Sequence, residues 1–479
     1  MSFTQFVFVP FLAVYLIASA LLPQRGWLWL AAIASAVFYA WWDWRFLFLL
    51  YYVTMVSWYC GLRIDRSTEE RERKFFVIAS VVSCLLVLGV FKYFNFFVDS
   101  FVRASAAIGM PMSESFARIG LPVGISFYTF HALSYTIDLY RRKLDRAADL
   151  LSVAVYLSFF PQLVAGPIVR AFQFLPQIRR GPVFSLRKIK LGLLIIAWGY
   201  FLKIAVADSI ALLVDPVFKA PYGHSTGDLL LAIFGYAFQI YGDFAGYSFI
   251  AIGVAKLQGF DFPANFLAPY FSRSFSEFWR RWHISLSSFL RDYLYIPLGG
   301  NRHGKVKEYR NLMVTMLLGG LWHGAAYNFV AWGFLHGLYL SLQRAAADLA
   351  RKFGLNGVTR AAGPIVAFVT DAIKMAFVFA LVLFAWIFFR LGSTSDIAHF
   401  LGGIAAWHGA AVVTNKFQVI KVLALIAAVI AVDAATIGRR RVVAIRRSAV
   451  AVAVVVAVLA VIVELLGSFG GGAFIYFQF

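Results

Sequence analysis

Long apolar runs recur from one end of the chain to the other, and they constrain the fold more than any other feature. Each can cross ~30 Å of hydrocarbon, which takes about 20 helical residues. Representative runs are Phe3–Leu22, Phe75–Phe97, Ile365–Phe389 and Ser448–Leu466. Only 14% of the residues are charged, whereas a soluble domain is about a quarter charged. Because lipid cannot satisfy an open backbone, we expect an all-α polytopic transmembrane helical bundle of about eleven to thirteen segments.

The basic residues indicate the orientation of the chain. The net charge is +21, and Lys and Arg collect on the cytoplasmic loops of membrane proteins. This predicts membrane lipids, and no nucleic acid, as partners of the basic surface. With the clusters inside, the N-terminus and the C-terminus both lie outside. The basic clusters are Arg63–Lys74, Arg141–Arg146, Arg170–Lys190, Arg273–Arg310, Arg344–Arg360 and Arg439–Arg447.

The rest of the organisation is simple. Phe3–Leu22 lacks a basic leader and a small-residue cleavage site, so we interpret it as a retained helix. Val153–Val169 is interrupted by prolines and glycine, which favours a short or re-entrant segment covered by protein. We predict one membrane domain over residues 1–466 and a glycine-tethered aromatic tail over residues 467–479.

The segment Ser274–Arg302 combines aromatic and basic side chains. Ser274 followed by Glu277 is a capping-box pattern for a helix start, and the large apolar residues then recur at helical spacing through Leu290. The pattern is typical of an interfacial amphipathic helix. Its cations also suggest steering of an anionic donor such as coenzyme A. The candidate donor-binding residues are Arg280, Arg281 and Lys305.

A second segment, Leu317–Leu340, places histidine inside an apolar run. His323 lies between Gly319–Gly320 and Gly324, where a helix can open and another backbone can approach closely. An intramembrane histidine is costly and faces a cavity or a partner. Trp322 and Asn328 are candidate supporting residues, and His336 is a weaker candidate in a smoother apolar run. From the residues alone, a packed core histidine remains the alternative to a catalytic one.

No pattern in the sequence predicts a metal site. The H-E-x-x-H motif is absent. Cys60 and Cys84 lie in or beside apolar segments, so they indicate neither a disulfide framework nor a zinc site. We expect no metal and no bound cofactor.

Six segments in order resemble the membrane-bound O-acyltransferase family, within it the bacterial alginate O-acetylase-like branch. At Gly242, Ala245 and Phe249 the chain departs from the residues expected there. The six segments are LPVGISFYTFHALSYTIDLYR (Leu121–Arg141), LSFFPQLVAGPIVR (Leu157–Arg170), FQIYGDFAGYSFIAIG (Phe238–Gly253), the Trp/Arg/His segment Phe278–Asn301, LWHG (Leu321–Gly324) and FIYFQF (Phe474–Phe479).

The resemblance implies a helical bundle around a central funnel in the bacterial inner membrane. It makes His323 the principal catalytic residue, acting as a general base or, less favoured, through an acyl-imidazole. His283 becomes a second catalytic candidate, and Asp243 a supporting one. Acetyl-CoA is the expected donor. The expected partners are a polysaccharide acceptor and a separate periplasmic hydrolase-like acetyltransferase.

The C-terminal tail has two interpretations. Tyr476 carries the only hydroxyl in FIYFQF, and tyrosine commonly anchors a helix at the headgroup level. Related bacterial systems imply instead that Tyr476 relays the acyl group across the membrane.

Three other functions are alternatives. The same acyl chemistry serves peptidoglycan O-acetylation and D-alanyl transfer to teichoic acid. A transporter or flippase is the alternative from another class, with His323 and intramembrane carboxylates such as Asp243 relaying protons.

Overall fold

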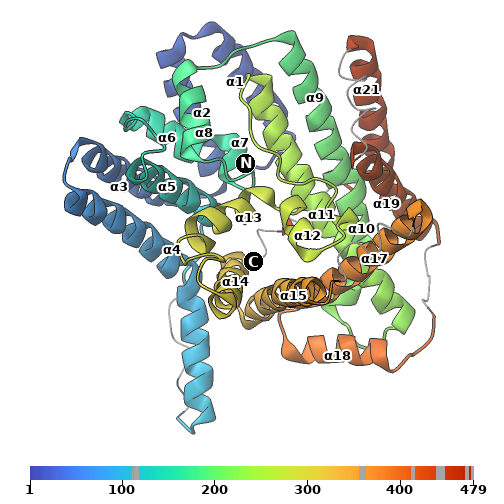
Figure 1. Cartoon of the computed structure of the whole chain (residues 1–479). Helices are drawn as coiled ribbons and strands as arrows, with labels where there is room; N and C mark the ends of the chain where they lie inside the picture. Colours follow the sequence, from blue (N-terminus) through green and yellow to red (C-terminus); the bar gives the residue numbers. More distant parts are fainter. Residues whose placement is uncertain are drawn as a thin grey trace. The chain divides into compact units, whose positions relative to one another are not determined.

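The computed structural model is built from helices. It describes residues 1–110, 112, 118–354, 363–410, 416–437, 448–469 and 474–475. Within these ranges there is no β-strand, and Figure 1 shows labelled helices from the blue to the red part of the chain. The prediction of an all-α fold is confirmed. The central funnel stays a prediction.

The chain divides into two compact units, which are described separately. The first unit contains Met1–Ile196 and Tyr247–Pro263. Two helices, α9 (Leu186–Tyr200) and α11 (Thr226–Leu257), contribute residues to both units. The remaining helices of the first unit are α1 (Phe8–Leu21), α2 (Gln24–Asp43), η1 (Trp44–Phe46), α3 (Leu47–Arg66), α4 (Glu70–Ala107), α5 (Ile125–Tyr140), α6 (Leu150–Ser158), α7 (Phe160–Leu163) and α8 (Ala171–Arg180).

The second unit contains Ala197–Gly246 and Ala264–Phe479. The predicted division into a membrane domain and a tail stays a prediction, and the described tail residues belong to this unit. Its helices are η2 (Phe201–Ala207), α10 (Asp208–Lys219), η3 (Pro269–Phe271), α12 (Phe275–Arg281), α13 (Ile284–Leu290), η4 (Arg291–Tyr295), α14 (Lys305–His323), α15 (Tyr327–Lys352), α17 (Gly363–Arg390), α18 (Thr394–Ala405), α19 (Lys416–Ile437) and α21 (Ala449–Leu466).

In the described part of the chain, seven helical segments are long and apolar enough to cross a membrane. The sequence predicts about eleven to thirteen segments. One reason for the difference is that α2, η1 and α3 together form one of the seven. Another is that α14 begins with four charged side chains in six residues. The seven are Gln24–Arg66, Glu70–Ala107, Leu186–Lys219, Thr226–Leu257, Gly363–Arg390, Lys416–Ile437 and Ala449–Leu466.

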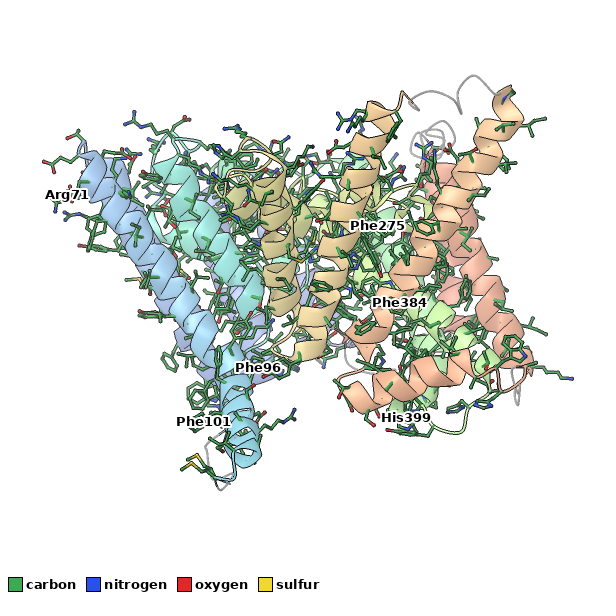
Figure 2. The ribbon with its side chains drawn as sticks, turned by 60° about the horizontal axis from the view of Figure 1, so that its bottom comes forward. Arg71, Phe96, Phe101, Phe275, Phe384 and His399 are labelled. Carbon is green, nitrogen blue, oxygen red and sulfur yellow. The ribbon has the colours of Figure 1, made fainter. Side chains whose placement is uncertain are left out.

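Helix α4 is longer than a membrane requires. Its 38 residues extend ~57 Å at 1.5 Å per residue, about twice the hydrocarbon thickness. Figure 2 shows Arg71 near one end of this helix and Phe101 toward the other. The helix is therefore about twice as long as a single crossing of the hydrocarbon requires.

The proline-containing segment Val153–Val169 is short and covered by protein. It forms α6 and α7, which are separated at Phe159, two residues before Pro161. Every residue from Val155 to Arg170 is buried. This is the covering that a re-entrant segment needs, because its interrupted backbone cannot face lipid.

One prediction about helix continuity is wrong. The apolar period from Ser274 to Leu290 predicts one helix, but the structure has α12 and α13, broken at Trp282 and His283. The start is as predicted, since the Ser274 hydroxyl accepts a hydrogen bond from the Glu277 N–H at 3.1 Å. The break arises because the Ile284 N–H donates to the Asn265 carbonyl at 2.9 Å, which replaces a helical bond.

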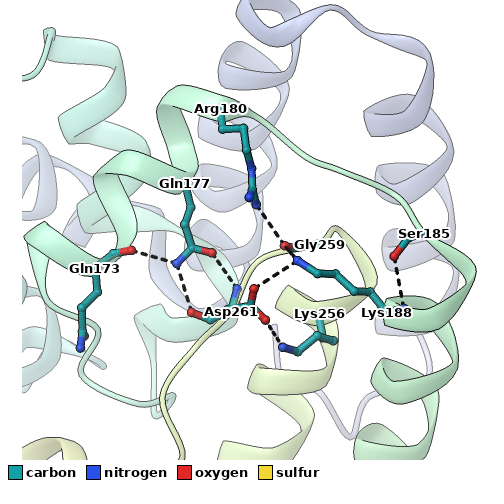
Figure 3. Close-up of polar contacts among 8 residues, drawn as sticks. All are labelled: Gln173, Gln177, Arg180, Ser185, Lys188, Lys256, Gly259 and Asp261. Atoms are coloured by element: carbon teal, nitrogen blue, oxygen red, sulfur yellow. Dashed lines mark hydrogen bonds and ion pairs between the residues drawn. The ribbon is translucent and has the colours of Figure 1, made fainter. Parts of the chain in front are cut away.

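An exposed lysine–aspartate network joins α8, α9 and the end of α11 in the first unit (Figure 3). Asp261 pairs with Lys188 at 3.1 Å and with Lys256, and its N–H donates to the Gln177 side chain at 2.7 Å. Burial acts to raise the pKa of Asp261, but hydrogen bonds from the two lysines outweigh it and lower that pKa. The network fixes the turn after α11.

Candidate active site

Glycines allow α14 and α15 to pack backbone against backbone, which places His323. A Cβ added at Gly320 would lie 2.2 Å from the Phe329 carbonyl oxygen, and one at Gly333 would lie 2.4 Å from that of Met316. No larger residue fits at either position. Figure 1 shows the two helices side by side. His323 is the last residue of α14, so the close approach predicted from its flanking glycines is confirmed.

His323 is enclosed by aromatic rings. His323 is only 4% exposed. Its ring centroid lies 4.9 Å from Trp322, 5.0 Å from Trp332 and 5.3 Å from Phe389, each at a steep angle. These rings exclude bulk water from the imidazole, which strengthens any electrostatic interaction made there.

His283 occupies the break between α12 and α13 in a strained conformation. Its φ is +41°, a left-handed value that costs an L-residue about 1–2 kcal/mol. Such strain persists where the surroundings fix the residue, and it clusters at functional sites. Here Asn265 fixes it, through its main chain to Ile284 and through its side chain to His283 and Ser285.

The same asparagine determines which His283 nitrogen carries the proton. The Asn265 Oδ1 accepts from the Ser285 N–H at 3.2 Å and from the Ser285 hydroxyl at 2.8 Å. His283 Nδ1, 3.1 Å from that oxygen, must therefore donate, and Nε2 keeps its lone pair. Nε2 has no hydrogen-bond partner in the described part of the chain. His283 lies outside the seven candidate spans, and burial lowers its pKa, which favours the neutral form.

The fold brings the two predicted histidines together. The ring centroids of His283 and His323 are 6.4 Å apart, although 40 residues separate them in the sequence. Trp322 contacts both, at 5.8 Å from His283 and 4.9 Å from His323. The arrangement offers two imidazoles in a dry aromatic site, and Nε2 of His283 is an unprotonated nitrogen that can accept a hydrogen bond.

Two other predicted residues do not join this pair through hydrogen bonds that the structure describes. The Asn328 amide donates to the Phe388 carbonyl at 3.1 Å, which ties α15 to α17. His336 is fully buried, with neither ring nitrogen hydrogen-bonded within the described ranges. Trp332 lies between the imidazoles, 4.7 Å from His336 and 5.0 Å from His323. His336 is therefore a packed neighbour of the site.

The three candidate donor-binding cations differ in availability. Arg281 pairs with Glu277 at 2.7 Å, and Lys305 pairs with Asp348 at 2.7 Å and with Glu308 at 3.3 Å. Arg280 is exposed and makes no ion pair with any described residue. Of the three, Arg280 is the one whose charge is available to an incoming anion.

Asp243 pairs with a cation, as an intramembrane carboxylate is expected to do, but the sequence analysis did not identify which one. Its carboxylate pairs with Lys203 at 2.7 Å, and Lys203 also hydrogen-bonds Asp208 at 2.8 Å. A signal was present, because Lys203 is a lone cation within an apolar run and such a cation requires a partner. Asn265 was also missed, and no pattern in the sequence links it to His283. Tyr476 lies outside the described residues.

The helical spans indicate a multi-pass membrane protein, and the buried histidine pair is its candidate active site. The model of the membrane-bound O-acyltransferase family matches residues 41–386. The chain belongs to this family and is an O-acyltransferase.

Named relatives cover most of the chain. The probable alginate O-acetylase AlgI of Pseudomonas aeruginosa is 42% identical over 387 residues, which cover 80% of this chain and 70% of the relative. The peptidoglycan O-acetyltransferase of Helicobacter pylori is 34% identical over 433 residues, 84% of this chain and 79% of the relative. The teichoic acid D-alanyltransferase of Bacillus subtilis is 25% identical over 305 residues, 62% and 73% of the two chains.

Proposed function

We propose that this protein takes an acetyl group from cytoplasmic acetyl-CoA and passes it towards a hydroxyl of an exopolysaccharide outside the bacterial inner membrane, with an alginate-like polymer as the first candidate. The observation that carries the proposal is the buried pair His283–His323, 6.4 Å apart between aromatic walls. The alginate O-acetylase relatives support the acetyl group and the polymer.

His323 acts as the general base in this mechanism. Its neutral imidazole takes the proton of the acceptor hydroxyl while the oxygen attacks the thioester carbonyl carbon. The carbon–sulfur bond then breaks, and the coenzyme A thiolate leaves and takes the proton from the imidazolium. The His283 Nε2 lone pair supplies a second acceptor that orients the hydroxyl or the imidazolium.

The direction of transfer follows from the basic loops. With these inside, the donor arrives from the cytoplasm and Arg280 is the cation available to steer it. Both termini then lie outside. Tyr476 receives the acetyl group as a relay, and a separate periplasmic hydrolase-like acetyltransferase moves it on to the polymer.

Peptidoglycan O-acetylation is the second candidate. The Helicobacter pylori relative supports it, because its match extends over 84% of this chain. The two candidates differ only in the acceptor. Acetylation of a purified alginate-like polymer, but not of peptidoglycan, by cells that express the protein with its partner would favour the first.

Acyl transfer from isotopically labelled acetyl-CoA tests the proposal. We expect His323→Ala to lower thioester consumption by about 10²–10⁴-fold, the usual contribution of a general base. His336→Gln is the matched control, because His336 is equally buried on the adjacent helix and should retain activity. Equal activity of His323→Ala and wild type would show that His323 is not the general base.

A second experiment tests the relay. Tyr476→Phe keeps the ring and removes only the hydroxyl, so label on the tail, followed by peptide mass analysis, should disappear. Full transfer to the polymer by this variant would eliminate the relay. A well-folded wild-type protein that consumes no thioester, with or without the partner, would favour the transporter.

A further inference from the structure

The described part of the C-terminal tail is held inside the protein. Phe474 and Ile475 are both buried, although they lie within five residues of the chain end. The Ile475 N–H donates to the Asp243 Oδ2 at 2.6 Å. A hydrogen bond to an ionised acceptor is roughly twice as strong as a neutral one. The tail is therefore attached at Ile475 by its main chain.

The acceptor of this bond belongs to a buried group with unbalanced charge. Lys203 faces two carboxylates, Asp208 at 2.8 Å and Asp243 at 2.7 Å. Their side chains are 7%, 11% and 5% exposed. One cation against two anions leaves a formal charge of minus one, and a buried unpaired charge is costly. Lys203 contacts Oδ1 of Asp243, whereas the tail amide meets the other oxygen, Oδ2.

Local sequence explains why these groups meet. A Cβ added at Gly246 would lie 2.8 Å from the Gly199 carbonyl oxygen and 2.9 Å from the main-chain nitrogen of Lys203. Only glycine allows α11 to approach η2 so closely. Segment η2 has π-type turns, which occur often at functional sites. The approach places the lysine beside Asp243.

The tail has a second attachment where it leaves α21. The Ser468 N–H donates to the Ile204 carbonyl at 3.2 Å, and the Ser209 hydroxyl donates to the Leu466 carbonyl at 3.2 Å. Both partners lie on η2 and α10, beside Lys203 and Asp208 in the sequence. The start of the tail thus binds η2 and α10, whereas Ile475 binds Asp243 on α11, and Lys203 of η2 pairs with that same aspartate.

The attached tail is linked to the candidate active site through ring contacts. Phe474 packs on Phe244 at 6.0 Å between ring centroids, and Phe244 packs on His283 at 4.6 Å. The residue that carries the tail amide's acceptor, Asp243, directly precedes Phe244. The bond to Ile475 therefore lies next to Phe474, whose ring packs on Phe244, and Phe244 in turn packs on His283.

We propose that the buried Lys203–Asp243 pair is a docking site for the main chain of the C-terminal tail, and that Asp243 is a positioning residue for acyl transfer. The docking is independent of the chemistry, whereas the positioning role rests on the proposed function. Asp208 shares the same lysine and has no hydrogen bond or ion pair with a described residue of the tail, so it provides a matched control.

The docking is tested by digestion of the purified full-length protein with a carboxypeptidase, followed by intact mass. Asp243→Ala removes the acceptor and leaves Lys203 balanced by Asp208. We expect the terminal residues to be released at least about tenfold faster than in wild type, from the worth of a hydrogen bond to a charged group. Asp208→Asn should release them at the wild-type rate. Equal rates in all three proteins, or equal acceleration in both variants, would overturn the docking.

The positioning role is tested by a double-mutant cycle with a chain that ends after Gly472. Asp243→Ala should lower acyl transfer in the full-length protein and cause no further loss in the shortened one, because both changes remove the same docked tail. Additive losses would overturn the role. If the shortened protein were fully active, neither the positioning role of Asp243 nor the Tyr476 relay would hold. The carboxypeptidase digestion would still test whether the tail docks at Asp243.

Discussion

Two lysine–aspartate clusters show how burial changes the contribution of an ion pair to stability. In the first unit, Asp261 meets Lys188 and Lys256, and the Asp261 side chain is 56% exposed. In the second unit, Lys203 meets Asp208 and Asp243, and no side chain is more than 11% exposed. Exposed pairs are worth about 0–1 kcal/mol because water screens them. Removing one partner of a buried pair costs about 3–5 kcal/mol.

The two clusters therefore have different structural roles. The exposed network shapes a turn, in which Gly259 has φ +87° and a Cβ would lie 2.1 Å from the Val183 carbonyl oxygen. Hydrogen bonds to main-chain atoms hold that turn as well, so no single charge is decisive. The buried cluster instead presents an excess carboxylate oxygen, and only a donor such as the tail amide can satisfy it.

The largest expected effect comes from removing the buried lysine. Lys203→Met should lower the free energy of unfolding by about 3–5 kcal/mol, because two carboxylates lose their cation in a dry environment. Lys188→Met should cost less than about 1 kcal/mol. Thermal unfolding in one detergent, followed by tryptophan fluorescence, measures both. Similar shifts in the midpoint would contradict the comparison.

A smaller effect is expected from widening the buried cluster without touching its charges. Gly246→Ala should cost about 1–3 kcal/mol, because the new methyl group meets main-chain atoms of Gly199 and Lys203 that cannot rotate away. Gly89→Ala is the control, since a Cβ there has no neighbour within 4 Å. In the middle of α4 it should stabilise by about 0.5–1 kcal/mol. Loss of stability in both variants would show that helix packing at Gly246 is not special.

The sequence predicted the parts of this arrangement that depend on local pattern. Apolar runs predicted the helices, and the glycines around His323 predicted a close approach that the structure has. The break at His283 was not predictable, because the apolar period continues through it. Asn265 causes the break from 18 residues away. The partnership of Lys203 with Asp243 also depends on two helices meeting, although an isolated lysine in an apolar run already requires a partner.

A still smaller loss of stability is expected when the exposed network loses its carboxylate. Asp261→Asn should lower stability by less than about 1 kcal/mol, because the carboxylate that makes both pairs is 56% exposed and water screens it. Raising the salt concentration from 0.1 M to 1 M should shrink the difference from wild type further, because the Debye length falls from about 10 Å to about 3 Å and becomes comparable with the length of these pairs. Unfolding midpoints at low and high salt measure it. A difference that salt does not change would mean that Asp261 acts through hydrogen bonds rather than charge.

The smallest effect is the pH dependence of that difference. The two lysines hold the pKa of Asp261 below its ordinary value of 3.8 despite partial burial. A carboxylate with a lowered pKa in the folded state contributes its full stabilisation above the unfolded-state pKa and loses it as the pH falls through the folded-state value. The gap in unfolding midpoint between wild type and Asp261→Asn should therefore be constant from about pH 7 to pH 5 and close below about pH 4. A gap that widens on acidification would have the wrong sign for a lowered pKa, and the ionised Asp261 would then not be the group that stabilises this turn.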